Sequence, residues 1–544
     1  MDTQKDFSKL DVIIVGAGFS GMYMLHRLRG LGLQVQVLEA GSDVGGTWYW
    51  NRYPGARCDV PSMEYSYSFS EALQQEWDWT EVMAAQPEIL EYARHVADRF
   101  GLRESISFDT RVTAAHYDEA SRQWRVSTEA GTHYQAQFCI MATGCLSVPN
   151  TPVIEGADSF AGPIYHTGQW PHEGVDFTGQ RVGIIGTGSS GIQAIPVIAE
   201  QAEHLTVFQR TPNYTMPARN APLTKAFLDK ARANYAEIRD TQRQSMAGII
   251  GYGFGFGGAD NVEPVDLIKE TTEQQRLARL DEQGFAAIRT YADIGIDLDA
   301  NEMACDLYRQ QVSRTVRNPE VAEGLKPKAY PIGCKRPVID TNYYETYNRD
   351  NVQLVDLRQG GIDCIMPNGI KTQQGDFECD VLVYATGFDA MTGALLKMDI
   401  RGRGGETLGE HWAAGPKTYL GLQVAGFPNM FTVTGPGSPS VLSNMIVSIE
   451  QHVDWIADCI SYLGQHQYRS IEAEVAAENE WVEHVNTVAN GTMLTAPSCN
   501  SWYLGANIPG KPRIFMPYVG GVGNYRAHCD GVVQAGYKGF ALSA

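Results

Sequence analysis

Two glycine-rich segments have the spacing of phosphate-binding turns. Each directly follows a short apolar run, and their sequences are Gly16-Ala17-Gly18-Phe19-Ser20-Gly21 and Gly186-Thr187-Gly188-Ser189-Ser190-Gly191. The glycines permit a tight turn and close backbone approach, and free N–H groups at the start of the following helix bind a pyrophosphate. One such pattern is only weakly specific, because glycine-rich turns also occur without a ligand. Two of them predict two bound dinucleotides, a flavin and the nicotinamide that reduces it.

The residue after the second strand of each unit distinguishes the two sites. In the first unit this residue is Glu39, whose carboxylate accepts hydrogen bonds from ribose hydroxyls and repels a 2′-phosphate, so FAD or NAD fits and NADP does not. In the second unit Arg210 and Thr211 occupy this place. A guanidinium pairs well with a phosphate, so NADP(H) fits there. The alternative is two solvated strand ends, which the opposite charges at matched positions make less favourable.

Composition limits the class of protein. The net charge of −20 argues against nucleic acid or an anionic membrane as a partner. The sequence contains neither an apolar run long enough to span a bilayer nor the apolar stretch of a signal peptide at its start. The 10 cysteines are scattered without a Cys-x-x-Cys pair, and the histidines lack metal-ligand spacing. We therefore expect reduced thiols, no metal and a cytoplasmic location. The missing pair also argues against the flavin disulfide reductases.

Strand and helix patterns alternate around the glycine turns. Residues 10–40 predict a β-α-β unit, and residues 86–100 predict an amphipathic helix with a proline near its start. Two buried strands, at 138–141 and 381–384, each end in an Ala-Thr-Gly turn. We expect these turns to mark crossings between domains, close to a dinucleotide; ordinary strand-end packing is the alternative.

The expected fold class is α/β, with two Rossmann-like dinucleotide-binding domains and a helical insertion, the plan shared by flavin monooxygenases and disulfide reductases. Residues 1–144 and 385–544 would form the FAD domain, and residues 145–219 and 330–384 the NADP domain. Residues 220–329 would form the insertion, whose glycine-aromatic patch Gly251–Gly258 we interpret as a flexible loop.

A longer pattern lies just before the second glycine turn. Residues 160–171 read Phe-x-Gly-x-x-x-His-x-x-x-Trp-Pro, with His166 and Trp170 at its fixed positions. This pattern resembles the signature of type I Baeyer–Villiger monooxygenases. The resemblance extends over residues 10–540 and includes segments 45–56, 385–389 and 501–507. Within the family, residues 435–440 are more similar to phenylacetone and steroid monooxygenases than to cyclohexanone monooxygenase.

The resemblance implies a reaction. NADPH reduces FAD, O₂ adds to give a C4a-peroxyflavin, and this peroxide attacks a ketone to give an ester or lactone while NADP⁺ stays bound. The anionic peroxide and the tetrahedral adduct both suit a permanent cation, and the resemblance assigns this role to Arg336, oriented by Asp59. Without the resemblance, Lys335-Arg336 would be interpreted as a surface pair and Asp59 as a turn residue.

The resemblance also implies roles for other residues. Lys335 would hold the NADP 2′-phosphate with Arg210 and Thr211, and Trp502 would fold over NADP and substrate. His166 and Trp170 fit conformational coupling, with structural packing as the alternative. Cys334 and Pro337 flank the Lys-Arg pair and depart from the family pattern. The residues expected to line the flavin, besides the first glycine turn and Glu39, are Gly46, Thr47, Trp48, Trp50, Asp59, Tyr65, Val112 and Met445.

Two other functions stay open at this point. A sister flavin monooxygenase would oxygenate amines or sulfur, but its linker motif lacks the Trp170-Pro171 ending. A non-catalytic NADP sensor would be a degenerate flavoprotein, which the intact glycine turns argue against. The expected partners are a small-molecule ketone and O₂, with no nucleic acid and no membrane, and the chain is expected to be a monomer.

Overall fold

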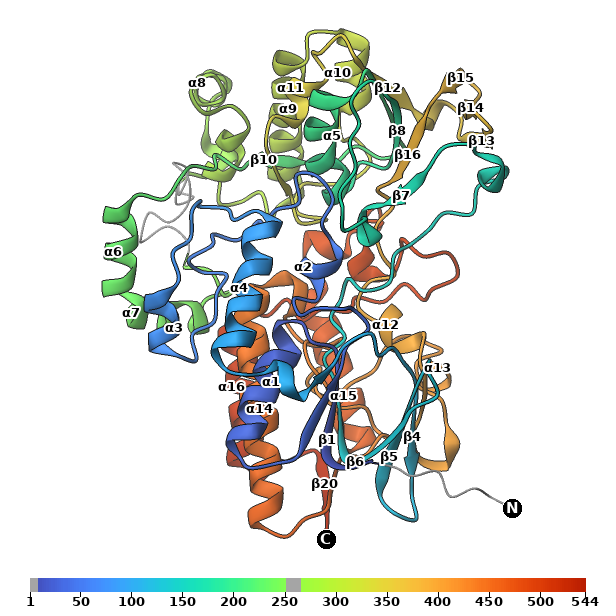
Figure 1. Cartoon of the computed structure of the whole chain (residues 1–544). Coiled ribbons are helices and arrows are strands. Elements are labelled where there is room, and N and C mark those ends of the chain that lie inside the picture. Colours follow the sequence, from blue (N-terminus) through green and yellow to red (C-terminus); the bar gives the residue numbers. More distant parts are fainter. Residues whose placement is uncertain (1–7, 251–265) are drawn as a thin grey trace.

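The computed structural model describes residues 8–250 and 266–544, and two sheets organise this part of the chain (Figure 1). The Gly251–Gly258 patch lies outside the described residues. The first sheet occupies the lower half of the view and the second sheet the upper half.

The first sheet has the strand order β17-β4-β5-β6-β1-β2-β3, with β18 beside β6. Its parallel part pairs β1 with β2 and β6, and an antiparallel meander continues from β6 through β5 to β4. Its strands are β1 (Ser8–Val15), β2 (Val35–Leu38), β3 (Ile106–Ser107), β4 (Val112–Asp118), β5 (Gln123–Thr128), β6 (His133–Met141), β17 (Asp399–Arg401) and β18 (Met430–Thr432).

Helices cover this sheet because its central strand is apolar on both faces. Residues 12–15 of β1 are all buried, the pattern of a parallel strand enclosed on two sides. The predicted β-α-β unit and the helix at 86–100 are confirmed, the latter with proline in its first turn. The helices of this half are α1 (Phe19–Gly30), α2 (Thr47–Trp50), α3 (Glu71–Glu76), α4 (Gln86–Arg99), α12 (Gly393–Leu396), α13 (Leu408–His411), α14 (Met445–Gln465), α15 (Val475–Ala489) and α16 (Val522–Gln534).

The second sheet is entirely parallel, with the order β12-β9-β8-β16-β7. Its strands are β7 (Ile164–His166), β8 (Arg181–Ile185), β9 (His204–Gln209), β12 (Val352–Asp356) and β16 (Val381–Tyr384), with α5 (Ser189–Gln201) following β8 and α11 (Tyr343–Thr346) packed on α5. Three small sheets complete the described part of the chain: β10 (Thr215–Pro217) with β11 (Val338–Asp340), β13 (Ile362–Met366) with β14 (Gly369–Thr372) and β15 (Gly375–Glu378), and β19 (Ser470–Ala473) with β20 (Phe540–Ser543).

The segment between residues 220 and 329 is helical where it is described, as its composition predicts. Its helices are α6 (Lys225–Ala233), α7 (Tyr235–Gln244), α8 (Glu273–Gln283), α9 (Leu298–Thr315) and α10 (Pro319–Leu325). Leu228 and Ile238 of the first two helices belong to the core of the first sheet, whereas Leu280 and Tyr308 of the later ones belong to the core of the second. The segment therefore packs on both halves of the molecule.

One expectation about the cysteines is wrong. Cys334 and Cys499 form a disulfide across a sequence separation of 165 residues, while the other eight cysteines are free. A pairing over that distance leaves no local spacing pattern, because it depends on how two distant segments pack in one core.

Candidate functional site

The two glycine turns are built alike. Gly16 and Gly186 have positive φ angles of 105° and 109°, which favour glycine. A Cβ atom on Gly16 would lie 2.6 Å from the carbonyl oxygen of Ala142, and one on Gly186 would lie 2.4 Å from that of Ala385. Each first glycine thus packs on the alanine of one Ala-Thr-Gly turn. The third glycines, Gly21 and Gly191, pack in turn on the carbonyls of the first, bringing strand and helix together.

One middle glycine faces open space, and the other packs closely against a further glycine. Gly188 is the N-cap of α5, and no described atom beyond its chain neighbours lies within 4 Å of where its Cβ would be. The first N–H groups of α5 therefore face open space, which is the cradle that a pyrophosphate needs. Gly18, the N-cap of α1, has the same β-region backbone and faces the Cα of Gly46. Both turns fit a dinucleotide.

Glu39 lies at the end of β2, beside the first glycine turn. Its carboxylate accepts hydrogen bonds from the backbone N–H groups of Ala17 at 2.6 Å and Gly41 at 2.7 Å. Burial raises the pKa of Glu39, and the two donors favour its ionised form. Each oxygen of an ionised carboxylate keeps a further acceptor site, so Glu39 can also bind ribose hydroxyls.

Two cations gather at the matching end of the second unit. Arg210 is exposed after β9, and Lys335 lies with Nζ 4.6 Å from the centre of the Tyr330 ring. Burial and the positive charge of Arg210 lower the pKa of Lys335 to about 8. The Thr211 carbonyl accepts a hydrogen bond from the hydroxyl of Thr187 in the glycine turn, at 3.2 Å. The positive charges of Arg210 and Lys335 repel each other, and a bound anion would relieve this repulsion. A 2′-phosphate is such an anion.

Lys335 and its neighbour Arg336 serve different sites. Arg336 Nη2 lies 3.0 Å from Asp59 Oδ1, and the two side chains are 36% and 32% exposed. Burial alone would lower the pKa of Arg336, but the carboxylate of Asp59 more than offsets it, and the pKa is raised. The positive charge of Arg336 also offsets part of the increase in pKa that burial causes at Tyr65 and Tyr503. The guanidinium therefore lies close to Asp59 and Tyr65, two of the residues expected to line the flavin.

The other expected flavin-lining residues lie at the starts of elements of the first half. Thr47, Trp48 and Trp50 belong to α2, directly after Gly46, and Trp48 Nε1 donates a hydrogen bond of 3.2 Å to the Tyr65 hydroxyl. Met445 begins α14, with its side chain partly buried. Val112 begins β4 and packs in the core of the sheet, so only its backbone is available to a ligand.

The Phe-x-Gly-x-x-x-His-x-x-x-Trp-Pro segment runs along β16. A Cβ on Gly162 would meet the carbonyl of Asp380 at 2.0 Å, and His166 Nε2 lies 3.2 Å from the hydroxyl of Thr386 in the Ala-Thr-Gly turn. His166 Nδ1 accepts the N–H of Gly168, and burial lowers the pKa of His166. Burial thus favours the neutral ring, which links β7 to the turn beside the second glycine turn. Trp170 is packed in the core of this half.

Trp502 lies in a 3₁₀ turn, Trp502–Leu504. It packs against the buried cluster of Cys145, Phe388, Ala390, Met391 and Met516, as do Met445 at the start of α14 and Val441 of the loop that follows β18. Lys511, further along the same segment, pairs with Asp389 after β16. The Trp502 segment therefore lies against the residues that follow the second Ala-Thr-Gly turn.

A cavity of about 990 Å³ opens beside this loop. Leu442, next to Val441, lines it together with Leu494 and Val519, and the imidazoles of His484 and His528 lie at its wall. The loop thus borders open, mainly apolar space through Pro439 and Leu442.

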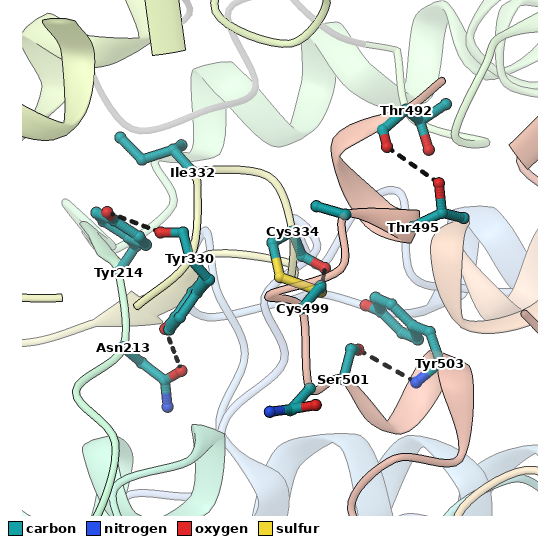
Figure 2. Close-up of a disulfide and its surroundings, with 12 residues drawn as sticks. Asn213, Tyr214, Tyr330, Ile332, Cys334, Thr492, Thr495, Cys499, Ser501 and Tyr503 are labelled. Carbon is teal, nitrogen blue, oxygen red and sulfur yellow. Dashed lines mark hydrogen bonds between the residues drawn. A yellow bond between two sulfur atoms is a disulfide. The ribbon is translucent and has the colours of Figure 1, made fainter. Parts of the chain in front are cut away.

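Three features at the site are not predicted by sequence reasoning. They are the Cys334–Cys499 disulfide, the Tyr330 ring beneath Lys335, and Asn213, whose amide donates to the Thr187 carbonyl and whose oxygen accepts from the Tyr330 hydroxyl. Figure 2 shows the disulfide between the segments of Tyr330 and Tyr503. Only Cys334 carries a sequence signal, as a departure from the family pattern beside the Lys-Arg pair.

Two kinds of feature are absent from residues 8–250 and 266–544. No helix there combines the length and the apolar character that a membrane crossing needs. Nor do three or more His, Cys, Asp or Glu side chains gather there as a metal site would require.

Comparison with known proteins decides the family. Residues 13–249 match the family described as pyridine nucleotide-disulphide oxidoreductase. The chain is 42% identical over 532 residues to a Baeyer–Villiger monooxygenase of Pseudooceanicola batsensis, covering 97% of this chain and 95% of that protein. The chain belongs to the Baeyer–Villiger monooxygenases. The expected enzyme class and reaction, FAD- and NADPH-dependent oxidation of ketones to esters or lactones, are thereby confirmed.

Further similarities refine this placement of the monooxygenase. A structure of oxidised steroid monooxygenase bound to NADP is 51% identical, with a TM-score of 0.90, and covers 98% of this chain and 100% of that one. This agrees with the resemblance of residues 435–440. A structure of OTEMO in complex with FAD and NADP is 40% identical, with a TM-score of 0.91, covering 98% and 99%. A phenazine N-monooxygenase of Lysobacter antibioticus is 40% identical over 542 residues, covering 99% of this chain and 98% of that protein.

Proposed function

We propose that this monooxygenase holds FAD on the first glycine turn and NADPH on the second, and that Arg336 acts between them on bulky ketones. One observation carries the proposal: consecutive side chains face the two sites, Lys335 toward Arg210 and Arg336 toward Asp59. The division of the chain at residues 144, 219, 329 and 384, the cytoplasmic location and the monomeric state belong to the same proposal.

Arg336 supplies a fixed positive charge. The bound flavin provides the redox chemistry that activates O₂ once NADPH has reduced it. As the ketone is attacked, negative charge grows on oxygen, and a guanidinium stabilises it without giving up a proton. Asp59 holds the guanidinium in place, since the ion pair restricts how far the long side chain can swing.

The second half of the site retains the coenzyme. Arg210 and protonated Lys335 bind the 2′-phosphate, while Thr187 and Thr211 fix the strand end against the glycine turn. Trp502 would fold over the bound coenzyme and exclude water from the reacting atoms. Trp502, Val441 and Met445 pack on the same buried cluster, which would couple this cover to the loop beside the cavity.

The cavity suggests the substrate class. A volume of about 990 Å³, lined largely by apolar side chains, has room for a polycyclic or aryl ketone, although none of the residues assigned above to the flavin, the coenzyme or catalysis lines it. The 51% identity to steroid monooxygenase supports a substrate of that size.

Oxygenation of a ring nitrogen is the second candidate. The similarity to a phenazine N-monooxygenase over nearly the whole chain favours it, although the complete Trp170-Pro171 signature favours the ketone reaction.

A substrate panel tests the proposal. Purified enzyme, NADPH and O₂ are given polycyclic, aryl, cyclic and long-chain ketones and aromatic N-heterocycles, and the products are identified. We expect esters or lactones, formed most efficiently from the bulky ketones. N-oxides without any ester would reject the ketone reaction. A protein that stays colourless after FAD is added would indicate a non-catalytic NADP sensor.

In the same assay, Arg336→Ala tests the residue role. Flavin reduction by NADPH should persist, because hydride transfer needs no charge at that place. Ester formation should fall by about 10²–10³, as when a stabilising donor is removed. Normal ester yield in this variant would remove Arg336 from the mechanism.

A further inference from the structure

The disulfide joins the two segments that carry Arg336 and Trp502. Cys334 precedes Lys335-Arg336, and Cys499 lies just before Trp502 on a loop 165 residues further along the chain, which packs in the same core as Cys334 (Figure 2). Both cysteines are fully buried, with 0% exposure.

Hydrogen bonds and packing also hold the two segments. The Cys334 segment is anchored where the Ile332 N–H donates to Asn301 of α9 at 3.0 Å and the Tyr330 hydroxyl donates to the Pro212 carbonyl at 2.8 Å. The Cys499 segment packs in the same core as Cys334, and its far end is held where Asn507 donates to the Phe388 carbonyl at 2.8 Å. The disulfide therefore adds a covalent tie to the packing between two segments that are far apart in the sequence.

We propose that Cys334–Cys499 is a redox modification site that positions Arg336 and Trp502 relative to each other. With the bond closed, the cation and the aromatic cover move together. With the bond opened to two thiols, Arg336 keeps its charge but is no longer held in register with the cover. Oxygen transfer to the ketone then falls, whereas flavin reduction continues. This inference rests on the roles proposed above for Arg336 and Trp502.

The chemistry is thiol–disulfide exchange. On closing, one cysteine thiolate attacks a sulfur of a small disulfide such as oxidised glutathione and releases one glutathione thiol. The second cysteine thiolate then displaces the other glutathione and completes the S–S bond. The protein loses two protons and two electrons, and the glutathione disulfide gains them. Reduction by a dithiol runs the same steps in reverse. Because both sulfurs are buried, either direction requires the Trp502 loop to move, so bound NADP⁺ should slow the exchange.

Thiol titration tests the bond itself. In denatured, non-reduced holoenzyme eight of the 10 cysteines should react, and all 10 after reduction. In native enzyme, NADP⁺ should slow reduction by about tenfold, as expected when a ligand suppresses local opening. Ten reactive thiols even after incubation with oxidised glutathione would overturn the proposal. Equal reduction rates with and without NADP⁺ would overturn the link to the coenzyme cover.

Turnover tests the positioning role. Oxidised and reduced wild type are compared with Cys334→Ser, Cys499→Ser and the double variant, and ester, hydrogen peroxide and the rate of flavin reduction are measured. The reduced wild type and all three variants should share an ester yield per NADPH about tenfold lower, with peroxide released instead. Flavin reduction should change by less than about twofold, which a general loss of structure would not allow.

The matched control is Cys379→Ser, which alters a buried free cysteine of the second half and should leave the ester yield unchanged. Equal ester yields in oxidised and reduced wild type would contradict the positioning role, whatever the variants do. A wild type that forms no ester in either state would reject the proposed function. The thiol counts and the NADP⁺ effect would still decide whether the bond forms and is linked to the coenzyme cover.

Discussion

The carboxylate of Asp59 lies 3.0 Å from the guanidinium of Arg336, although Asp59 follows α2 in the first half and Arg336 precedes β11 of the second. Both side chains are about one-third exposed. An ion pair with that exposure contributes about 0–1 kcal/mol to stability. Its main effect is therefore on where the guanidinium points.

Asp59→Asn should separate orientation from stability. The change keeps the shape of the side chain but removes the charge that holds Arg336. We expect flavin reduction to be nearly unchanged and ester formation to fall by roughly tenfold, because a misplaced catalytic group costs rate steeply. Stopped-flow reduction and product analysis measure the two steps. The control is Asp240→Asn, which breaks a pair of the same 3.0 Å length on α7. Full ester output from Asp59→Asn would show that Arg336 needs no such anchor.

Arg210→Ala should discriminate between the two nicotinamide coenzymes. We propose that the guanidinium binds the 2′-phosphate, which NADPH carries and NADH lacks. Loss of a charged hydrogen bond of about 1.5–3 kcal/mol should raise KM for NADPH by about tenfold or more and leave KM for NADH nearly constant. Arg349→Ala, an exposed arginine of the same half, is the matched control. An equal rise for both coenzymes would refute a 2′-phosphate role for Arg210.

The titration of Lys335 should make the KM for NADPH depend on pH. Its pKa of about 8 means that the side chain is mostly charged at pH 7 and loses its proton as the pH rises through that value. Since a phosphate binds the charged form, KM for NADPH should rise above pH 8, approaching tenfold per pH unit. Steady-state kinetics from pH 7 to 9.5 test this. The KM for NADH, and the KM for NADPH of Lys335→Met, should stay flat over the same range. Parallel profiles for NADPH and NADH would assign the titration to another group.

The parts of the site that repeat locally could be predicted from the sequence. Both glycine turns and both Ala-Thr-Gly turns are short patterns that follow a strand directly. Their residues therefore predict two dinucleotide-binding units without any knowledge of distant contacts. Their mutual contact, Gly16 on Ala142 and Gly186 on Ala385, follows from parallel pairing of neighbouring strands.

The parts that depend on how distant segments meet could not be predicted. The Tyr330 ring beneath Lys335 and the pairing of Cys334 with Cys499 leave no periodic signal, because side-chain spacing reports only local structure. The helices between residues 220 and 329 have the expected type, but amphipathic patterns do not say which of two cores they cover.

Glu64 makes the stability of the enzyme depend on pH. The side chain is 1% exposed, Oε2 accepts the Ile250 N–H at 2.7 Å, and burial raises its pKa to about 7 from the ordinary 4.5. A carboxyl whose pKa is higher in the folded state binds its proton more tightly there. Its stabilising contribution is therefore complete below pH 4.5 and is lost as the pH rises through about 7.

Glu64→Gln should remove this dependence, because the amide resembles the protonated acid and its oxygen can still accept from Ile250. We expect the variant to gain stability relative to wild type between pH 5 and pH 8, on the order of 1–3 kcal/mol. Thermal and urea unfolding of both proteins at several pH values measure the difference. Glu237→Gln, on the exposed face of α7, should show no such trend. If Glu64→Gln loses the same amount of stability at pH 5 and pH 8, Glu64 does not titrate between these values in the folded enzyme.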